Sequence, residues 1–190
     1  HTIHMTEYCS YSFNPSTATE TTVSEHWECP HKAHSDTDVC LYHMDVSARE
    51  RHDITAEDIT EQLTNILKNG SPKQRKFIGA TLPELNFKYV DIEAENQDPT
   101  DFRHAEIQAF GAERAKFEEQ LDFRHATIGE LDLNNADLEE GILCSNATIN
   151  GPMSLYEAFI TSDNADFTNT TFEGPVTIDE ADFGNDLSFR

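Results

Sequence analysis

Three cysteines and two histidines lie close together near the N-terminus. Cys29 and His31 are separated by one proline, and Cys40 and His43 by two residues. Thiolates and imidazoles bind Zn²⁺, and four such ligands without a water make a closed, structural site. The sequence therefore predicts a structural zinc ion in this segment. Its expected ligands are Cys9, Cys29, Cys40 and His43, with His31 as a substitute for any one of them.

Other interpretations of this cluster stay open from the sequence. Cys29 and Cys40 could form a disulfide, although nothing indicates an oxidising compartment. The thiols could also be free and buried, or the grouping could be fortuitous in a chain with nine histidines. A catalytic metal is less favoured, because no acidic residue stands at an obvious general-base spacing beside the ligands. Cys144 is far away in sequence, and we expect it in the wall of the fold that follows.

The segment that carries these residues needs support from the rest of the chain. Residues 5–47, here called the N-terminal module, show little apolar periodicity and are too short to bury a core without a staple. A capping helix and linker are expected over residues 48–71, with Thr55 as N-cap and Asp58 at the capping-box position. The helix has an apolar stripe at helical spacing, made of Ala56, Ile59, Leu63, Ile66 and Leu67.

From Phe77 onward, an apolar residue recurs about every five positions. The clearest run is Phe123, Ile128, Leu133, Leu138 and Leu143. A period of five fits neither the 3.6 residues of a helix turn nor the two-residue alternation of a strand. Residues 101–107 and 122–128 are near-copies of one another. Such duplication indicates stacked coils, so the expected fold class is an all-β solenoid over residues 72–190.

Small residues precede many of these apolar positions, as in residues 126–128, 136–138, 165–167 and 181–183. These segments resemble the Ala-Asp/Asn-Leu/Phe unit of pentapeptide-repeat proteins, and the resemblance covers residues 77–190. It implies a right-handed quadrilateral β-helix with four units per coil and five to six coils. The pattern is interrupted at Gln97, at Ala112 and over residues 150–153, where we expect loops or bulges.

The chain is strongly acidic. Its 190 residues include 36 Asp and Glu against 13 Lys and Arg, for a formal net charge of −23. This charge repels phosphates, so direct nucleic-acid binding is not expected. The acidity fits either a proteome adapted to concentrated salt or a surface that imitates DNA. We favour salt adaptation, because acidic residues also dominate outside the repeat and Lys is scarce.

No catalytic motif stands out in the sequence, which lacks a Gly-rich phosphate loop and a nucleophile elbow. His104 and His125 would stack one coil apart, and their place before an inward alanine favours solvated or stacked surface histidines over a functional site. We therefore expect a non-enzymatic, cytoplasmic scaffold that binds a protein partner through its solenoid faces. The combination of Cys/His module, helix and repeat resembles cytoplasmic pentapeptide-repeat proteins of salt-loving archaea.

Three alternative functions remain open. Some pentapeptide-repeat proteins are rod-shaped DNA mimics, so the chain could inhibit a type II topoisomerase such as gyrase. It could also be the cytoplasmic domain of a longer membrane protein; no stretch here approaches the roughly 18 apolar residues of a membrane span. A zinc-dependent enzyme would require an open coordination position.

The two ends of the chain carry expectations of their own. Residues 1–4, ahead of Met5, look like the remnant of an expression tag. The last repeat unit stops at Phe189 without a capping element. Because stacked folds need caps at both ends, we expect either a longer native chain or two copies stacked end to end as a homodimer.

Overall fold

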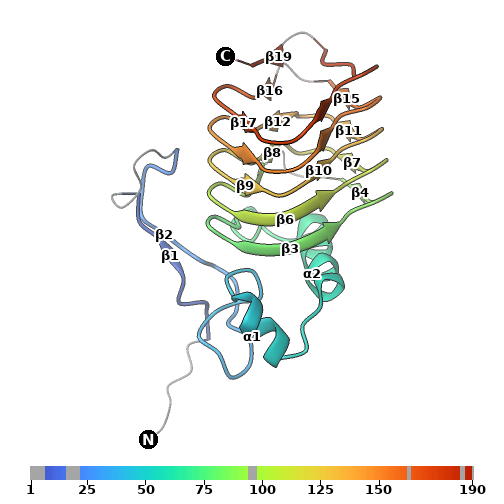
Figure 1. Ribbon diagram of the computed structural model, residues 1–190. Coiled ribbons are helices and arrows are strands. Elements are labelled where there is room, and N and C mark those ends of the chain that lie inside the picture. The colour runs from blue at the N-terminus through green and yellow to red at the C-terminus, as the bar shows by residue number, and fades with distance from the viewer. Residues whose placement is uncertain (1–6, 16–21, 94–97, 162–163, 185–186, 190) are drawn as a thin grey trace, which may run out of the picture.

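The main body of the protein is a β-solenoid of about five turns, built from short parallel strands (Figure 1). This confirms the all-β solenoid predicted from the sequence. The computed structural model describes five stretches of the chain: residues 7–15, 22–93, 98–161, 164–184 and 187–189. The expected tag remnant at residues 1–4 lies outside the described residues.

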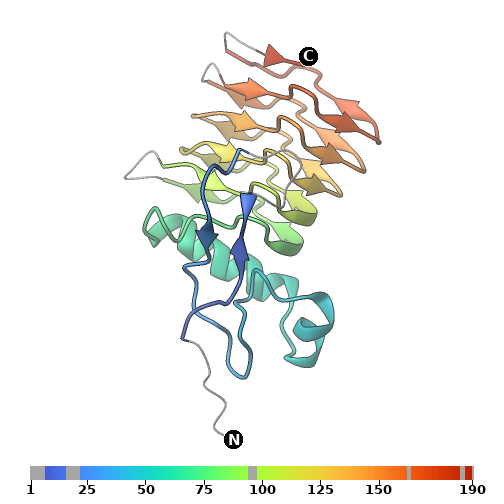
Figure 2. The ribbon, with the colours of Figure 1, turned by 90° about the vertical axis from the view of Figure 1, so that its left-hand side faces the viewer.

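The elements before the solenoid are short. Strands β1 (Ser12–Phe13) and β2 (Trp27–Glu28) form an antiparallel hairpin. Helices α1 (Val46–Arg51) and α2 (Ala56–Asn69) follow. The hairpin lies beside the solenoid, and α2 lies across the end where the first coil begins (Figure 1, Figure 2). No helix among the described residues is long and apolar enough to cross a membrane.

The strands of the solenoid form three parallel sheets. The large sheet contains β3 (Thr81–Asn86), β6 (Glu106–Gly111), β9 (Thr127–Ile128), β10 (Leu131–Asp132), β13 (Thr148–Ile149), β14 (Met153–Ser154), β17 (Thr171–Phe172) and β18 (Val176–Thr177). It divides after β6, which pairs with both β9 and β10. Later coils therefore present two rows of short strands where the first two coils have one long strand.

Two smaller sheets complete each coil. The four-stranded sheet contains β4 (Asp91–Ile92), β7 (Lys116–Phe117), β11 (Asp137–Leu138) and β15 (Phe159–Ile160). The five-stranded sheet contains β5 (Thr100–Asp101), β8 (Leu121–Asp122), β12 (Ile142–Leu143), β16 (Ala165–Asp166) and β19 (Leu187–Ser188). Parallel strands of this kind leave the backbone of each coil hydrogen-bonded to the next.

The register gives the length of a coil. Ile107 pairs with Ile128, and Ile128 pairs with Ile149, so these positions are equivalent on three successive coils in the middle of the solenoid. The same spacing separates the duplicated segments 101–107 and 122–128, which therefore lie one coil apart as the sequence predicts. All three isoleucine side chains are buried, because each lies in the same inward column.

The predicted five-residue run is wrong at Leu143. Leu143 pairs with Asp122, which brings Cys144 level with Phe123. Cys144 is fully buried in the core, whereas Leu143 is only partly buried. The inward step after Leu138 therefore ends at Cys144 and is one position longer than the others. A coil from Phe123 to Cys144 consists of three steps of five and one of six, so an uninterrupted run of five cannot continue around it.

The expected loop at Ala112 is also wrong. Ala112 is fully buried and lies on the inward column of Phe87, since Asn86 pairs with Gly111. The ring of Phe110 lies 5.1 Å from that of Phe87. This large neighbour packs into the interior beside the alanine, so the coil keeps its course.

Extra residues occur at the other two predicted interruptions. Ile128 pairs with Ile149 but Leu131 pairs with Met153, so one residue is added between β13 and β14. Gln97 lies outside the described residues. The register on its two sides shows an insertion, because the stretch from β4 to β5 is longer than the equivalent stretch from β7 to β8 on the next coil.

Stacked aromatic rings form the centre of the core. The ring centroids of Phe77 and Phe102 are 5.4 Å apart, and those of Phe102 and Phe123 are also 5.4 Å apart. All three side chains are fully buried. Offset stacking of this kind adds to the free energy gained from apolar burial. The column continues through Cys144 to Phe167, so one continuous core runs along the solenoid.

The helix α2 begins where the sequence predicts. Thr55 accepts a hydrogen bond from the backbone of Asp58, whose side chain accepts one from Thr55 in return. This capping box satisfies backbone donors at the first turn. The buried residues of α2, which are Ile59, Leu63 and Leu67, belong to the same hydrophobic core as the first coil. The shorter helix α1 was not predicted from the sequence.

Candidate metal centre

Four of the five predicted ligands lie together in the structure. One ligand atom each from Cys9, Cys29, Cys40 and His43 falls within 4.8 Å of all the others. The His43 Nδ1 atom is 3.3 Å from the Sγ of Cys40 and 3.8 Å from that of Cys9. The Sγ atoms of Cys29 and Cys40 are 3.7 Å apart. The three thiols are free and buried, so the disulfide considered from the sequence is not formed.

Backbone hydrogen bonds around the hairpin position the cysteines. The N–H of Cys9 donates to the carbonyl of His31 at 2.9 Å, and that of Cys29 to the carbonyl of Tyr11 at 3.0 Å. His43 follows Cys40 in a tight turn, in which its N–H donates to the Cys40 carbonyl at 3.2 Å. The turn explains why a Cys-x-x-His spacing brings both side chains to one point.

The first coil of the solenoid orients the His43 ring. Its Nε2 atom lies 2.9 Å from the carbonyl oxygen of Ile78. Because a carbonyl can only accept, Nε2 carries the proton and the lone pair of Nδ1 faces the thiols. A metal-binding histidine is typically held by such a bond from its other ring nitrogen. The ring orientation therefore fits a metal ligand.

An aromatic side chain closes one side of this group. The ring of Tyr11 stacks on His43, with centroids 3.9 Å apart and planes inclined by 12°. The close approach depends on Gly79, which has φ +65° and no side chain, since a Cβ there would clash with the Tyr11 hydroxyl. The neighbouring aromatic ring and the buried thiols leave the group shielded from solvent.

The three thiols interact strongly with one another. Hydrogen bonds from Cys29 and Cys40 lower the pKa of the Cys9 thiol far below its usual range. Hydrogen bonds with Cys40 and Cys9, together with burial, raise the pKa of Cys29. Cys9 is thus the thiol of the two that gives up its proton more readily. A bound cation would release the remaining protons.

His31, the predicted substitute ligand, has a different place. Its Nε2 atom lies 3.1 Å from the carbonyl of Lys76, and its ring stacks on Phe77 with centroids 5.0 Å apart. The side chain is buried, and burial lowers its pKa to about 4. His31 is therefore a neutral ring that joins the module to the first coil, and it is not part of the group of four.

The group of four could bind a metal ion. Three sulfur atoms and one imidazole nitrogen satisfy the coordination number of a tetrahedral ion, which leaves no position for water or substrate. Soft thiolate ligands select metals such as zinc over magnesium or calcium. The arrangement suits a structural centre better than a catalytic one.

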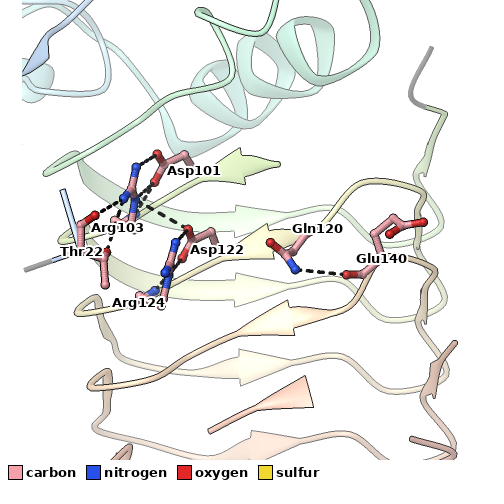
Figure 3. A network of polar contacts seen from close by, with 7 residues as sticks. All are labelled: Thr22, Asp101, Arg103, Gln120, Asp122, Arg124 and Glu140. Atoms are coloured by element: carbon pink, nitrogen blue, oxygen red, sulfur yellow. Dashed lines mark hydrogen bonds and ion pairs between the residues drawn. The ribbon is translucent and has the colours of Figure 1, made fainter. Parts of the chain in front are cut away.

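A second polar network joins the hairpin region to the five-stranded sheet (Figure 3). Arg103 donates to Asp101 at 2.7 Å and to the carbonyl of Thr22 at 2.8 Å, and it lies 3.6 Å from Asp122. Arg124 repeats this arrangement one coil further on, at 2.7 Å from Asp122. Both carboxylates are nearly inaccessible to solvent, so each needs its arginine.

The two repeated histidines stack as expected. The rings of His104 and His125 are 4.8 Å apart and nearly parallel. Both residues have positive φ, near 60°, at a corner of the coil. Phe13 covers His104 with a centroid distance of 4.6 Å, so this histidine is half-buried and stacked, which is one of the two predicted arrangements. Burial, His125 and Arg103 lower its pKa to about 4.

The sequence did not predict two buried charged residues, Glu119 and Arg75, near the start of β5. Glu119 is fully buried, and its carboxylate accepts a hydrogen bond from Thr100 at 3.0 Å. Arg75 is buried nearby, and burial raises the pKa of Glu119. Both residues fall in stretches where the five-residue pattern is weak, so no repeat position marked them as inward-facing.

Comparison with protein-family models, with curated proteins and with solved structures gives no match to this chain. The fold and the site themselves define its class, which is a β-solenoid with a Cys₃His group at its N-terminal end. Its function is therefore argued from the geometry described above.

Proposed function

We propose that this chain is a non-enzymatic, acidic scaffold that binds another protein through the faces of its solenoid. The main support for this proposal is the excess of carboxylates on outward positions of stacked coils. Between His125 and Phe189 the sequence has 13 acidic residues and no Lys or Arg. Regular faces with a strong field of one sign favour a partner of opposite charge.

The proposed fold family is that of the pentapeptide-repeat proteins, with a right-handed quadrilateral coil. Support comes from the constant coil length in the middle of the solenoid and from the buried alanines two positions before the central apolar residues, such as Ala126 and Ala136. The two rows of the large sheet, together with the two smaller sheets, would make four sides. The net charge of the whole chain also fits adaptation to concentrated salt, whereas the scaffold proposal concerns the carboxylates on the solenoid faces.

The proposed metal is a structural zinc ion, held by Cys9, Cys29, Cys40 and His43. The donor set and the fixed His43 ring support this assignment. When bound, zinc supplies a rigid crosslink between the hairpin, the turn and the first coil. The three free thiols of the group are compatible with the reducing conditions of a cytoplasm.

Site-specific photo-crosslinking in cells of the source organism tests the scaffold. A photoreactive amino acid is placed at one exposed position of each sheet, such as Thr127, Glu93 and Asn164. We expect one protein to be crosslinked reproducibly from one or two faces and not from the others. Absence of any reproducible crosslinked protein from all three faces would refute the scaffold function.

A DNA-mimicking inhibitor of gyrase is the second candidate. The four-stranded sheet presents the acidic side chains Asp91, Glu93, Glu118, Asp137 and Glu139 on successive coils. Lys116 pairs with two of them, at 3.2 Å from Glu118 and 3.0 Å from Glu139, which interrupts the row. A supercoiling assay with purified gyrase tests this candidate, and no inhibition at micromolar protein would exclude it.

A further inference from the structure

A groove separates the helical segment from the outer face of the large sheet. It has a volume of about 460 Å³ and lies between α1, the start of α2 and the strands β3, β6 and β9. Its wall includes Val46 and Ile54, and its floor includes Pro83, Gln108 and Gly129. The groove belongs neither to the metal group nor to the network that joins the hairpin region to the five-stranded sheet.

This part of the groove is mainly apolar. Val46 stands at the start of α1 with 61% of its surface exposed. The guanidinium of Arg49, also in the wall, already donates to the carbonyl oxygen of Leu41 at 3.0 Å. Gly129 allows the backbones of two coils to approach closely in the floor, since a Cβ at this position would clash with the carbonyl oxygen of Gln108. An apolar side chain entering from outside would be covered by the helix and the sheet together.

The groove continues into an acidic part. A second hollow adjoins the first at Ala56 and is lined by Glu57, Glu61 and Glu84. A third shares Glu84 with the second and adds Glu130 and Asp132, which lie at β10, two coils beyond β3. Five carboxylates thus adjoin the apolar part, three of them on α2 and β3 and two at β10.

These carboxylates have almost no basic neighbours. The only lysine that lines the described hollows is Lys88, which pairs with Glu113 at 2.5 Å. The ion pairs in the part of the chain that the structure describes leave Glu57, Glu84 and Glu130 without a basic partner. A cationic ligand would relieve the mutual repulsion of this group.

We propose that this groove binds an extended, basic peptide segment of a partner protein, with an apolar side chain in the Val46 end and lysines or arginines along the acidic end. A metal ion would leave the apolar part unexplained, and a neutral apolar ligand would leave the carboxylates unexplained. Charge complementarity and an apolar anchor together fit a peptide. The inference rests on the proposed scaffold function and assigns its partner to one place.

Fluorescence anisotropy with a defined probe tests the groove. The probe is a fluorescein-labelled peptide with one leucine followed by four lysines alternating with serines, and the salt concentration is about 0.15 M, which screens distant charges. The variant Glu84→Gln/Glu130→Gln removes two groove charges, and Asp91→Asn/Glu93→Gln removes two exposed charges from the four-stranded sheet. We expect the groove variant to weaken binding about tenfold and the control less than about twofold.

A double-mutant cycle tests the apolar end. Val46→Ser and replacement of the peptide leucine by serine should each weaken binding about fivefold, and the second change should add little once the first is made. Equal losses for the two charge variants, or additive effects of the two apolar changes, would overturn the groove assignment. Crosslinking from the solenoid faces in cells would then still support the scaffold, so the two failures are distinguishable.

Discussion

The N-terminal module and the solenoid are held together in different ways. The solenoid has a continuous core in which phenylalanine rings and aliphatic side chains of successive coils stack. The described part of the module has few fully covered apolar side chains besides its three cysteines. Its segments converge on one point instead, the Cys₃His group. The comparison indicates that the module depends on a crosslink, whereas the solenoid depends on the stacking of its coils.

The two regions meet through backbone carbonyls of the first coil. His43 contacts the carbonyl of Ile78 and His31 that of Lys76. In the opposite direction, a backbone N–H of the first coil, at the start of β3, donates to the carbonyl of Tyr42 at 2.8 Å. These bonds fix the module on the end of the solenoid, so a metal bound by His43 would also stabilise this junction.

The largest expected effect follows from removal of one ligand. Cys40→Ser should abolish zinc binding and unfold the module, because structural zinc sites contribute about 10 kcal/mol or more to the folding of small domains. Elemental analysis and far-ultraviolet circular dichroism measure the two effects. The solenoid should keep its strand signal. Loss of that signal together with the zinc would show that the two regions are not independent.

Cys144→Ser is the matched control for this variant. It makes the same chemical change in the solenoid core, where Cys144 is fully buried. We expect an unchanged zinc content and a solenoid destabilised by about 1–3 kcal/mol, because a hydroxyl replaces a thiol without a partner. A lower zinc content in this variant would contradict the assignment of the ligands.

Truncation of the aromatic column tests the other side of the comparison. Phe123→Ala should lower the free energy of unfolding of the solenoid by about 3–5 kcal/mol, as expected for a large side chain lost from a packed core. Denaturant unfolding measures this change. The zinc content should stay at that of the unaltered protein, and a parallel loss of metal would mean that the module needs an intact core.

Arg103→Met tests the network that joins the regions. It would leave Asp101 without its arginine and remove the bond to Thr22, so we expect a loss of about 3 kcal/mol in the free energy of unfolding. Arg124→Met leaves the contact with the hairpin region intact. If the network matters for docking, only the Arg103 variant should increase proteolysis of the hairpin.

The smallest effect concerns the pH dependence of the solenoid. The pKa of His104 is lowered to about 4 in the folded protein and is near 6.5 in an unfolded chain. Stability should therefore be complete above pH 6.5 and fall as the pH decreases toward 4, where the loss levels off. Since the side chain is half-exposed, we expect a difference of about 1 kcal/mol.

His104→Asn isolates this contribution. Asparagine tolerates positive φ and occupies the same corner at Asn146 and Asn169. The neighbours His125 and Arg103 are unchanged in the variant. The difference between the two stability curves should change between about pH 6.5 and pH 4 and stay level on either side of that range. A constant difference at all pH values would assign the effect to packing and not to titration.

The repeat could be predicted from the sequence because a stacked coil imposes a regular inward position. The same regularity led to wrong predictions at Leu143 and Ala112. The coil from Phe123 to Cys144 contains one longer step that cannot be recognised from the identity of the residues, so Cys144 and not Leu143 fills the core. Ala112 is small enough to look like an interruption, yet Phe110 packs into the interior beside it.

The candidate site was predictable in its members but not in its surroundings. Cysteine and histidine can be recognised as possible metal ligands from residue type alone, and the Cys40–His43 spacing requires only a local turn. The place of His31 depends on Lys76 and Phe77, which belong to a different part of the fold. The local spacing favoured His43 as the ligand, but no local pattern could place His31 against the first coil. The groove beside α1 could likewise not be predicted from the sequence, because it forms only where the helices meet the sheet.

Hydrogen exchange followed by mass spectrometry, on the whole chain with and without a zinc chelator, tests the central contrast most directly. We predict that removal of zinc will release the amides of residues 9–15 and 22–43 to rapid exchange, while those of residues 100–160 keep their protection. Unchanged protection of both regions, or simultaneous loss in both, would contradict the account.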